Sequence, residues 1–241
     1  MVVGHGDPLL LVHDSPAHAL TAATFALSSA MMMPVRVFKT GASMTKILVA
    51  YTTNSGSTEE VAQEIAKGLE KSGAQAEVRR LEEVTSLEDY QAVIVGAPMI
   101  LGWHRAAQNF VKKHRAALAS RPVAYFCTAM SLTQTGEDRV QSVPVCIDPW
   151  LAKPAQKPGS LSFKERYALP SNYIAPMLKA APEVKPVSIG LFGGKLELFR
   201  LNIFQMLFVM LVIRAQPGDL RNWSAIGQWA AEIGPALCRA G

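Results

Sequence analysis

The junction between a short apolar run and a helical pattern near residue 50 limits the folds that this chain can adopt. The run Lys46–Tyr51 is rich in β-forming residues, and small polar residues fill positions 53–58 directly after it. From Ser57 to Ser72, apolar residues recur at four-residue spacing, which predicts an amphipathic helix. A strand that passes through a small polar loop into a helix is typical of an α/β fold.

The remainder of the chain repeats this alternation. We predict strands at 46–51, 76–81, 92–96, 122–127 and 187–192, and helices at 57–72, 106–119, 196–214 and 222–238. Alternation at this spacing predicts a doubly wound parallel sheet with right-handed crossovers and helices on both faces. Ligands of such sheets bind beyond the carboxyl ends of the strands. The loops after Tyr51, Gly96 and Cys127 are therefore the candidate site.

Two segments fall outside this alternation. Residues 1–43 have no clear strand or helix period, so we expect a disordered or mis-assigned leader ahead of a single domain at 44–241. A targeting segment is the alternative. Residues 131–185 are rich in Pro, Ser and Lys, and they predict a long insertion without periodicity, apart from a short helix within 171–184. Unstructured connections of this length are usually functional or mobile.

The predicted helix at 196–214 contains the run MLFVMLVI, which is apolar on every side and lies between Arg200 and Arg214. The run is too short to span a bilayer. A helix of this kind is either buried in a core or a dimer interface, or lies at a membrane surface. The sequence leaves both alternatives open.

Charge and cysteine content narrow the classes of partner. The formal net charge of +5 belongs to residues 44–241, because the few charges of the leader cancel. This excess favours an acidic partner, an anionic small molecule or an anionic membrane surface, and solubility alone is the alternative. Three cysteines without a C-x-x-C pair argue against a disulfide framework or a zinc site, and they predict a reducing compartment. We expect no metal, no catalytic side-chain triad and no nucleic-acid partner.

The first loop, TNSGST at 53–58, has the composition of a phosphate cradle. The first amides of the following helix have no internal acceptor and lie at the positive end of its dipole. Gly56 allows close backbone approach, and four of the six residues carry hydroxyl groups. The loop holds no Lys or Arg, unlike a P-loop, so it suits a phosphate that is held rather than transferred. An ordinary Ser or Thr N-cap is the alternative.

This loop resembles the S/T-x-T-G-x-T motif with which flavodoxins hold the phosphate of FMN, with Ser55 in place of the usual Thr. The resemblance covers about 46–238. It implies a flavodoxin-like, five-stranded parallel sheet in the order 2-1-3-4-5, with an extra apolar helix near the C-terminus. It also implies FMN as the cofactor, and the residues that would contact its phosphate are Thr53, Asn54, Ser55, Gly56, Ser57 and Thr58.

The same resemblance assigns the other two loops to the flavin ring. The second loop would supply backbone contacts and a stacking indole, through Ala97, Pro98, Met99, Ile100, Leu101, Gly102 and Trp103. The third loop would contribute Thr128, Ala129, Met130 and Ser131. The alternative for Trp103 is a surface aromatic that packs on the following helix. His104 either caps that helix or donates to a ligand, and the basic residues at 105–115 form a solvated face or accept a carboxylate-bearing substrate.

The stretch GAPMILGWHRAAQNFVKKH and residues 198–233 are similar to one branch of the family, the bacterial quinone-linked protoporphyrinogen IX dehydrogenases. The resemblance implies FMN-dependent oxidation of protoporphyrinogen IX or a similar reduced substrate, with a quinone as electron acceptor. It also implies a cytoplasmic protein with peripheral contact to the inner face of the cell membrane. Two functions remain as alternatives, a flavodoxin-type electron carrier and an NAD(P)H:quinone reductase, and a homo-oligomer is open. A sequence pI near 9.2 argues against the carrier, because such carriers are usually strongly acidic.

Overall fold

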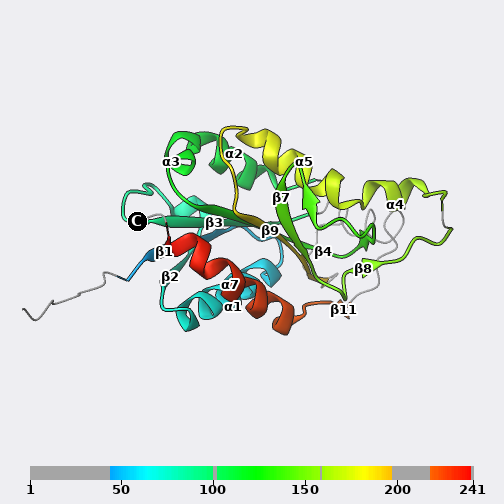
Figure 1. The fold of residues 1–241 in the computed structure, drawn as a ribbon, viewed down its shortest axis with the longest axis horizontal. Coiled ribbons are helices and arrows are strands. Elements are labelled where there is room, and N and C mark those ends of the chain that lie inside the picture. The colour runs from blue at the N-terminus through cyan, green and yellow to red at the C-terminus, as the bar shows by residue number, and fades with distance from the viewer. Residues whose placement is uncertain (1–43, 100–101, 158, 197–217, 240–241) are drawn as a thin grey trace, which may run out of the picture. The chain divides into compact units, whose positions relative to one another are not determined.

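The computed structural model describes residues 44–99, 102–157, 159–196 and 218–239 (Figure 1). They belong to one unit of the chain, Ala42–Gly241. The leader predicted at 1–43, two second-loop residues (Ile100 and Leu101) and nearly all of the apolar helix predicted at 196–214 lie outside the described residues.

The strands are β1 (Lys46–Tyr51), β2 (Gln75–Arg80), β3 (Ala92–Pro98), β4 (Val123–Ala129), β5 (Leu132–Thr133), β6 (Arg139–Val140), β7 (Val143–Ile147), β8 (Ala152–Lys153), β9 (Ser188–Gly193), β10 (Lys195–Leu196) and β11 (Gly218–Asp219). The helices are α1 (Ser57–Lys71), the 3-10 helix η1 (Leu81–Glu83), α2 (Arg105–Lys113), α3 (Arg115–Ala119), α4 (Phe163–Tyr167), α5 (Pro170–Ala180) and α7 (Trp223–Cys238). None of these helices is long and apolar enough to cross a membrane.

Seven of the described strands form the main sheet, in the order β2-β1-β3-β4-β9-β7-β6. All neighbouring pairs are parallel except β6 and β7. The predicted order of five strands is present within this sheet. The predicted number of strands is wrong, because β7 adds a sixth parallel strand beyond β9, and β6 pairs with β7 at the edge.

Helices cover both faces of the sheet, with α1 and α7 on one side and α2, α3 and α5 on the other (Figure 1). The four-residue spacing predicted for α1 is confirmed, because Val61, Ile65 and Leu69 are fully buried. Gly68 lets α1 approach α7 closely, since a Cβ atom there would lie only 2.6 Å from the Cβ atom of Ala230. The two helices therefore pack as one layer, with α1 over β1, β3 and β4 and α7 over β9.

The insertion at 131–185 is not the unstructured connection that the sequence predicts. It forms β5, β6, β7, β8, α4 and α5, and of these only α5 matches the short helix expected within 171–184. Strand β7 joins the main sheet by pairing with β9, from Val145 opposite Ile189 to Ile147 opposite Leu191. Two-residue strands and segments interrupted by proline are too short to show a period, which is why the pattern does not reveal them.

A buried carboxylate holds the end of β7 in place. Asp148 is fully buried and accepts hydrogen bonds from the amide of Trp150 at 2.9 Å, the side-chain amide of Asn222 at 3.2 Å and the amide of Gly193 at 3.3 Å. Asn222 also caps α7 by accepting from the amide of Ala225 at 3.2 Å. Buried carboxylates are tolerated only when they are hydrogen-bonded, so this residue joins β7, β9 and α7.

Replacing Asp148 by Ala should lower the free energy of unfolding by about 3 kcal/mol, because it leaves buried donors without an acceptor. Urea denaturation followed by circular dichroism measures the change. The matched control is Asp89→Ala, which removes an exposed carboxylate and should shift stability by less than about 0.5 kcal/mol. Equal effects of the two substitutions would contradict the role given to Asp148.

Candidate functional site

The first loop follows β1 and ends at the N-terminus of α1, as predicted. Gly56 has a φ of +92°, in the left-handed region that favours glycine. Its amide donates to Thr53 Oγ1 at 2.9 Å, which closes a tight turn. Gly56 is also the N-cap of α1, and no side chain caps this helix. The alternative of an ordinary Ser or Thr N-cap is therefore wrong.

Two backbone amides at the start of α1 have no protein acceptor within the described ranges. The carbonyl of Gly56 accepts from the amides of Glu59 at 3.1 Å and Glu60 at 3.4 Å, which leaves the amides of Ser57 and Thr58. Both of these residues are buried. Because buried amides without an acceptor are rare and costly, and because they lie at the positive end of the helix dipole, this turn is suited to an anion.

The first and third loops are joined by a buried hydrogen bond. The hydroxyl oxygens of Thr58 and Thr128 lie 2.9 Å apart, and neither side chain reaches solvent to any extent. The hydroxyl of Thr58 is thus engaged with β4. Its backbone amide is the group left for a phosphate.

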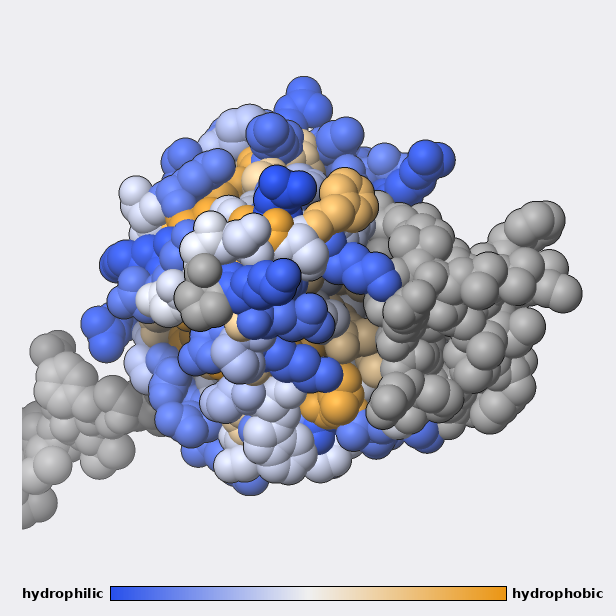
Figure 2. All heavy atoms as spheres, turned by 90° about the vertical axis from the view of Figure 1, so that its right-hand side faces the viewer, coloured by the Kyte–Doolittle hydropathy of each residue, from blue (hydrophilic) through white to orange (hydrophobic). Residues whose placement is uncertain are grey.

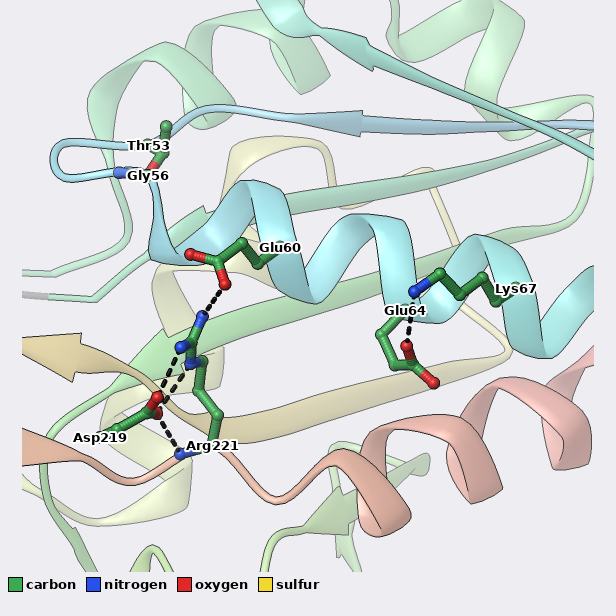
Figure 3. A network of polar contacts seen from close by, with 7 residues as sticks. All are labelled: Thr53, Gly56, Glu60, Glu64, Lys67, Asp219 and Arg221. Carbon is green, nitrogen blue, oxygen red and sulfur yellow. Dashed lines mark hydrogen bonds and ion pairs between the residues drawn. The ribbon is translucent and has the colours of Figure 1, made fainter.

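The acidic residues in the first turn of α1 both have partners from elsewhere in the fold. Glu59 lies beside the phenol of Tyr51, and burial together with this carboxylate raises the pKa of Tyr51 to about 12. Glu60 Oε2 lies 2.7 Å from Nη1 of Arg221, beside the turn that contains Thr53 (Figure 3). Sequence reasoning missed Arg221, and no spacing or pattern relates it to the first loop.

The second loop differs from its prediction at Trp103. A bridge between Met99 and Trp103 closes this loop, and Gly102 has a φ of +101°. Only 1% of Trp103 is exposed, and its ring centroid lies 5.4 Å from that of Tyr125 in the core between the sheet and α2. This burial is at odds with the predicted stacking on a cofactor ring, and it also excludes a surface aromatic.

His104, which follows the second loop, has the simpler of its two predicted roles. His104 caps α2, because its Nδ1 accepts from the amide of Ala106 at 3.2 Å. Ala97 is fully buried, and the amide of Met99 donates to the carbonyl of Thr128 at 2.8 Å. This last bond ties the second loop to the third.

The third loop is held by segments that the sequence did not connect with it. Thr128 and Ala129 belong to β4, and the carbonyl of Ala129 accepts from the amide of Gly194 at 2.8 Å. The carbonyl of Ser131 accepts from the phenol of Tyr173 in α5 at 2.9 Å. Met130, between them, is half-buried.

Residues of the insertion also reach the second loop. The ring of Tyr167 meets that of Tyr173 edge to face, with centroids 6.3 Å apart. Burial raises the pKa of Tyr167, and the backbone amide of Gly102 opposes this rise, which places the phenol next to the second loop. Sequence reasoning missed both tyrosines, because no pattern in the insertion relates it to the strand ends.

A separate groove of about 420 Å³ runs between α2 and α5 and contains none of the residues predicted to contact the cofactor. Its lining consists of Gln108, Lys112, Asn172, Ala175, Pro176, Lys179 and Ala180. The described side chains include no group of three or more His, Cys, Asp or Glu that could hold a metal ion. At the strand ends, the first loop offers two backbone amides without a protein acceptor in the described part of the chain, and the second and third loops lie beside it.

A family model described as a flavodoxin domain matches residues 48–220. The chain is 40% identical over 85 residues to the quinone-linked protoporphyrinogen IX dehydrogenase of Escherichia coli (strain K12), a match that covers 34% of this chain and 46% of that protein. It is 35% identical over 81 residues to an NAD(P)H dehydrogenase (quinone) of Acidovorax ebreus (strain TPSY), which covers 24% of this chain and 40% of that protein. The chain thus spans less than half the length of these curated relatives.

Among solved structures, the chain is similar to the two-electron reduced flavodoxin of Megasphaera elsdenii. The identity is 13%, the TM-score is 0.40, and the match covers 77% of this chain and 98% of the flavodoxin.

Replacing Thr58 by Val should lower the free energy of unfolding by about 1–2 kcal/mol, because the buried hydroxyl of Thr128 loses its partner. The double substitution Thr58→Val with Thr128→Val should cost less than the sum of the single ones, since it removes both polar groups. Chemical denaturation measures all three. Thr85→Val, at an exposed position, is the control and should have almost no effect. Additive costs at 58 and 128 would refute the coupling.

Proposed function

The chain belongs to the flavodoxin domain family and its cofactor is FMN, and we propose that it is an FMN-dependent oxidoreductase acting on protoporphyrinogen IX or a similar reduced substrate, with a quinone as electron acceptor. The observation that carries this proposal is the 40% identity over 85 residues to a protein of that activity. The activity of the whole protein is inferred, because the match covers 46% of that relative.

The first loop fits the phosphate of FMN. Gly56 is in the left-handed conformation, and the amides of Ser57 and Thr58 lack an acceptor in the described part of the chain. A loop without Lys or Arg binds through amides and hydroxyls, which suits a phosphate that stays in place. The first loop would therefore hold the phosphate, and the second and third loops would contact the ring through their backbone.

FMN supplies the electron-transfer chemistry when it is bound, and the protein supplies binding, orientation and electrostatics. The bond between Met99 and Thr128 and the bond between Thr58 and Thr128 fix the three loops relative to one another. A rigid set of loops holds the cofactor in one orientation at the sheet edge.

Charge on the α2 side supports a carboxylate-bearing substrate such as a porphyrinogen. Between Gln91 and Gly136 the chain has five Lys or Arg residues and no Asp or Glu. Two of the five are engaged in the fold, because Arg115 pairs with Glu183 at 3.3 Å and Arg121 donates to the carbonyl of Tyr90 at 2.7 Å. Lys112 and Lys179 both line the groove between α2 and α5. Anionic groups are attracted to a surface of this sign.

Exposed aromatic side chains in the insertion support contact with an apolar partner, such as a quinone or the membrane that carries it. Trp150 is 63% exposed, and Phe163 is 75% exposed. Figure 2 faces the end of the molecule where β8, β11 and α4 lie, and there hydrophobic side chains form small separate areas among hydrophilic ones. Trp side chains, with an apolar ring and a polar N–H group, are enriched at interfaces with partners and membranes.

An NAD(P)H:quinone reductase is the second candidate, favoured by the similarity to the Acidovorax ebreus protein. The two functions differ only in the electron donor. Rapid mixing of the FMN-loaded protein with NADPH, followed at the flavin absorption band, separates them: bleaching within seconds would support the reductase.

The purified protein should bind FMN, and Gly56→Ala should weaken that binding by at least about tenfold, because the left-handed backbone is strained for alanine. Gly136→Ala is the matched control, since Gly136 also has a positive φ, of +73°, and an added Cβ atom there would meet no atom within 4 Å. Flavin fluorescence titration measures both. Equal affinities of the two variants would contradict the cradle.

The FMN-loaded protein should oxidise protoporphyrinogen IX anaerobically when menadione is present as acceptor. Porphyrin fluorescence measures the product, and the apoprotein is the control. Absence of turnover with menadione, together with bleaching of the flavin by NADPH, would replace this proposal by the reductase.

A further inference from the structure

The first turn of α1 combines two features that oppose each other. Its free amides are suited to a phosphate, yet Glu59 and Glu60 lie in the same turn. Carboxylates stabilise a helix N-terminus when no anion is bound, but they repel a phosphate dianion at the same place. A cation that pairs with either carboxylate therefore lowers the repulsion that a phosphate meets at this turn.

Arg221 is such a cation for Glu60. Its Nη1 atom lies 2.7 Å from Glu60 Oε2. The side chain of Arg221 is only 5% exposed, whereas that of Glu60 is 53% exposed. Nη1 is therefore an ion-pair partner of Glu60 in the first turn. The same nitrogen makes no hydrogen bond of good geometry within the described residues. The loop itself contains no cation, so the positive charge comes from a distant part of the chain.

The guanidinium group of Arg221 is held rigidly. Its Nε donates to Asp219 Oδ1 at 2.7 Å, its Nη2 contacts the other oxygen of the same carboxylate, and its backbone amide donates to Oδ1 at 3.1 Å (Figure 3). On another side it lies over the ring of Trp223, 4.5 Å from the centroid. The pKa of Asp219 is lowered by this arginine. Held in this way, Nη1 stays beside the helix N-terminus.

We propose that Arg221 is a positioning residue for the FMN phosphate, because it holds the carboxylate of Glu60 in an ion pair and so prevents repulsion at the N-terminus of α1. The inference rests on the proposed FMN site in the first loop. Arg221, from the C-terminal part of the chain, would thus supply the cationic side chain that the first loop does not contain.

The test is a double-mutant cycle on FMN affinity. Arg221→Met should weaken FMN binding to the apoprotein by about tenfold at low salt, because Glu60 is left unpaired beside the phosphate. Glu60→Gln should bind FMN at least as tightly as the wild type. The double variant should recover most of the lost affinity, because Glu60 no longer carries a charge, and the loss that remains measures Asp219, which stays without its arginine.

Two controls separate this role from a structural one. Riboflavin has the same ring without the phosphate, and its affinity should be the same in all variants. Lys67→Met breaks the pair between Lys67 and Glu64, at 3.3 Å and farther along the same helix, and should change FMN affinity by less than about twofold. Raising the salt to about 0.5 M should shrink the loss in Arg221→Met, because screening weakens repulsion.

Three results would overturn the proposal: unchanged FMN affinity in Arg221→Met, an equal loss for riboflavin, or a loss that Glu60→Gln does not rescue. Rescue cannot come from repaired packing, since Asp219 and Trp223 stay without their arginine in the double variant. A wild-type protein that binds no FMN would instead refute the first-loop site before the cycle begins.

Discussion

The parallel pairing of β1, β3 and β4 is the constraint on which the candidate site depends. The register sets Tyr51 beside Gly96 and Pro98 beside Thr128, so three loops that are far apart in the chain meet at one edge of the sheet. Gly96 contributes to this arrangement, because a Cβ atom there would lie 1.9 Å from the ring of Phe126. The missing side chain lets β4 place its phenyl ring over β3, beneath the layer formed by α1 and α7.

The insertion at 131–185 widens the sheet and supports the loops at the strand ends. Its strand β7 widens the sheet beyond β9, and the three bonds to Asp148 anchor that strand to β9 and α7. Its helices α4 and α5 then reach back to the strand ends, where Tyr173 donates to the carbonyl of Ser131. A segment that interrupts the alternation of strands and helices thus becomes a support for the third loop and a neighbour of the second.

The sequence predicted those parts of the fold that have a long, regular pattern. The strand, loop and helix at 46–71 were predictable, because a buried strand gives a continuous apolar run and an amphipathic helix gives apolar residues at four-residue spacing. Strands β5 to β8 were not, because they are short and are held by contacts such as those of Asp148. The turn at Gly56 was predictable from the small polar residues around it. The burial of Trp103 was not, because an indole after a strand fits a surface and a core equally well, and its contact with Tyr125 is a tertiary one.

Tertiary contacts also explain why the charge at the first loop could not be predicted from the residues of the loop alone. Taken by itself, the first turn of α1 is an acidic helix start, and the carboxylates of Glu59 and Glu60 would repel an anion bound there. Glu59 lies beside the phenol of Tyr51, which is neutral at physiological pH because its pKa is about 12, and Glu60 pairs with Arg221. The acidic residues can therefore stabilise the helix end in the absence of a ligand. The repulsion that remains when a phosphate binds is set by partners that only the folded chain brings to this turn.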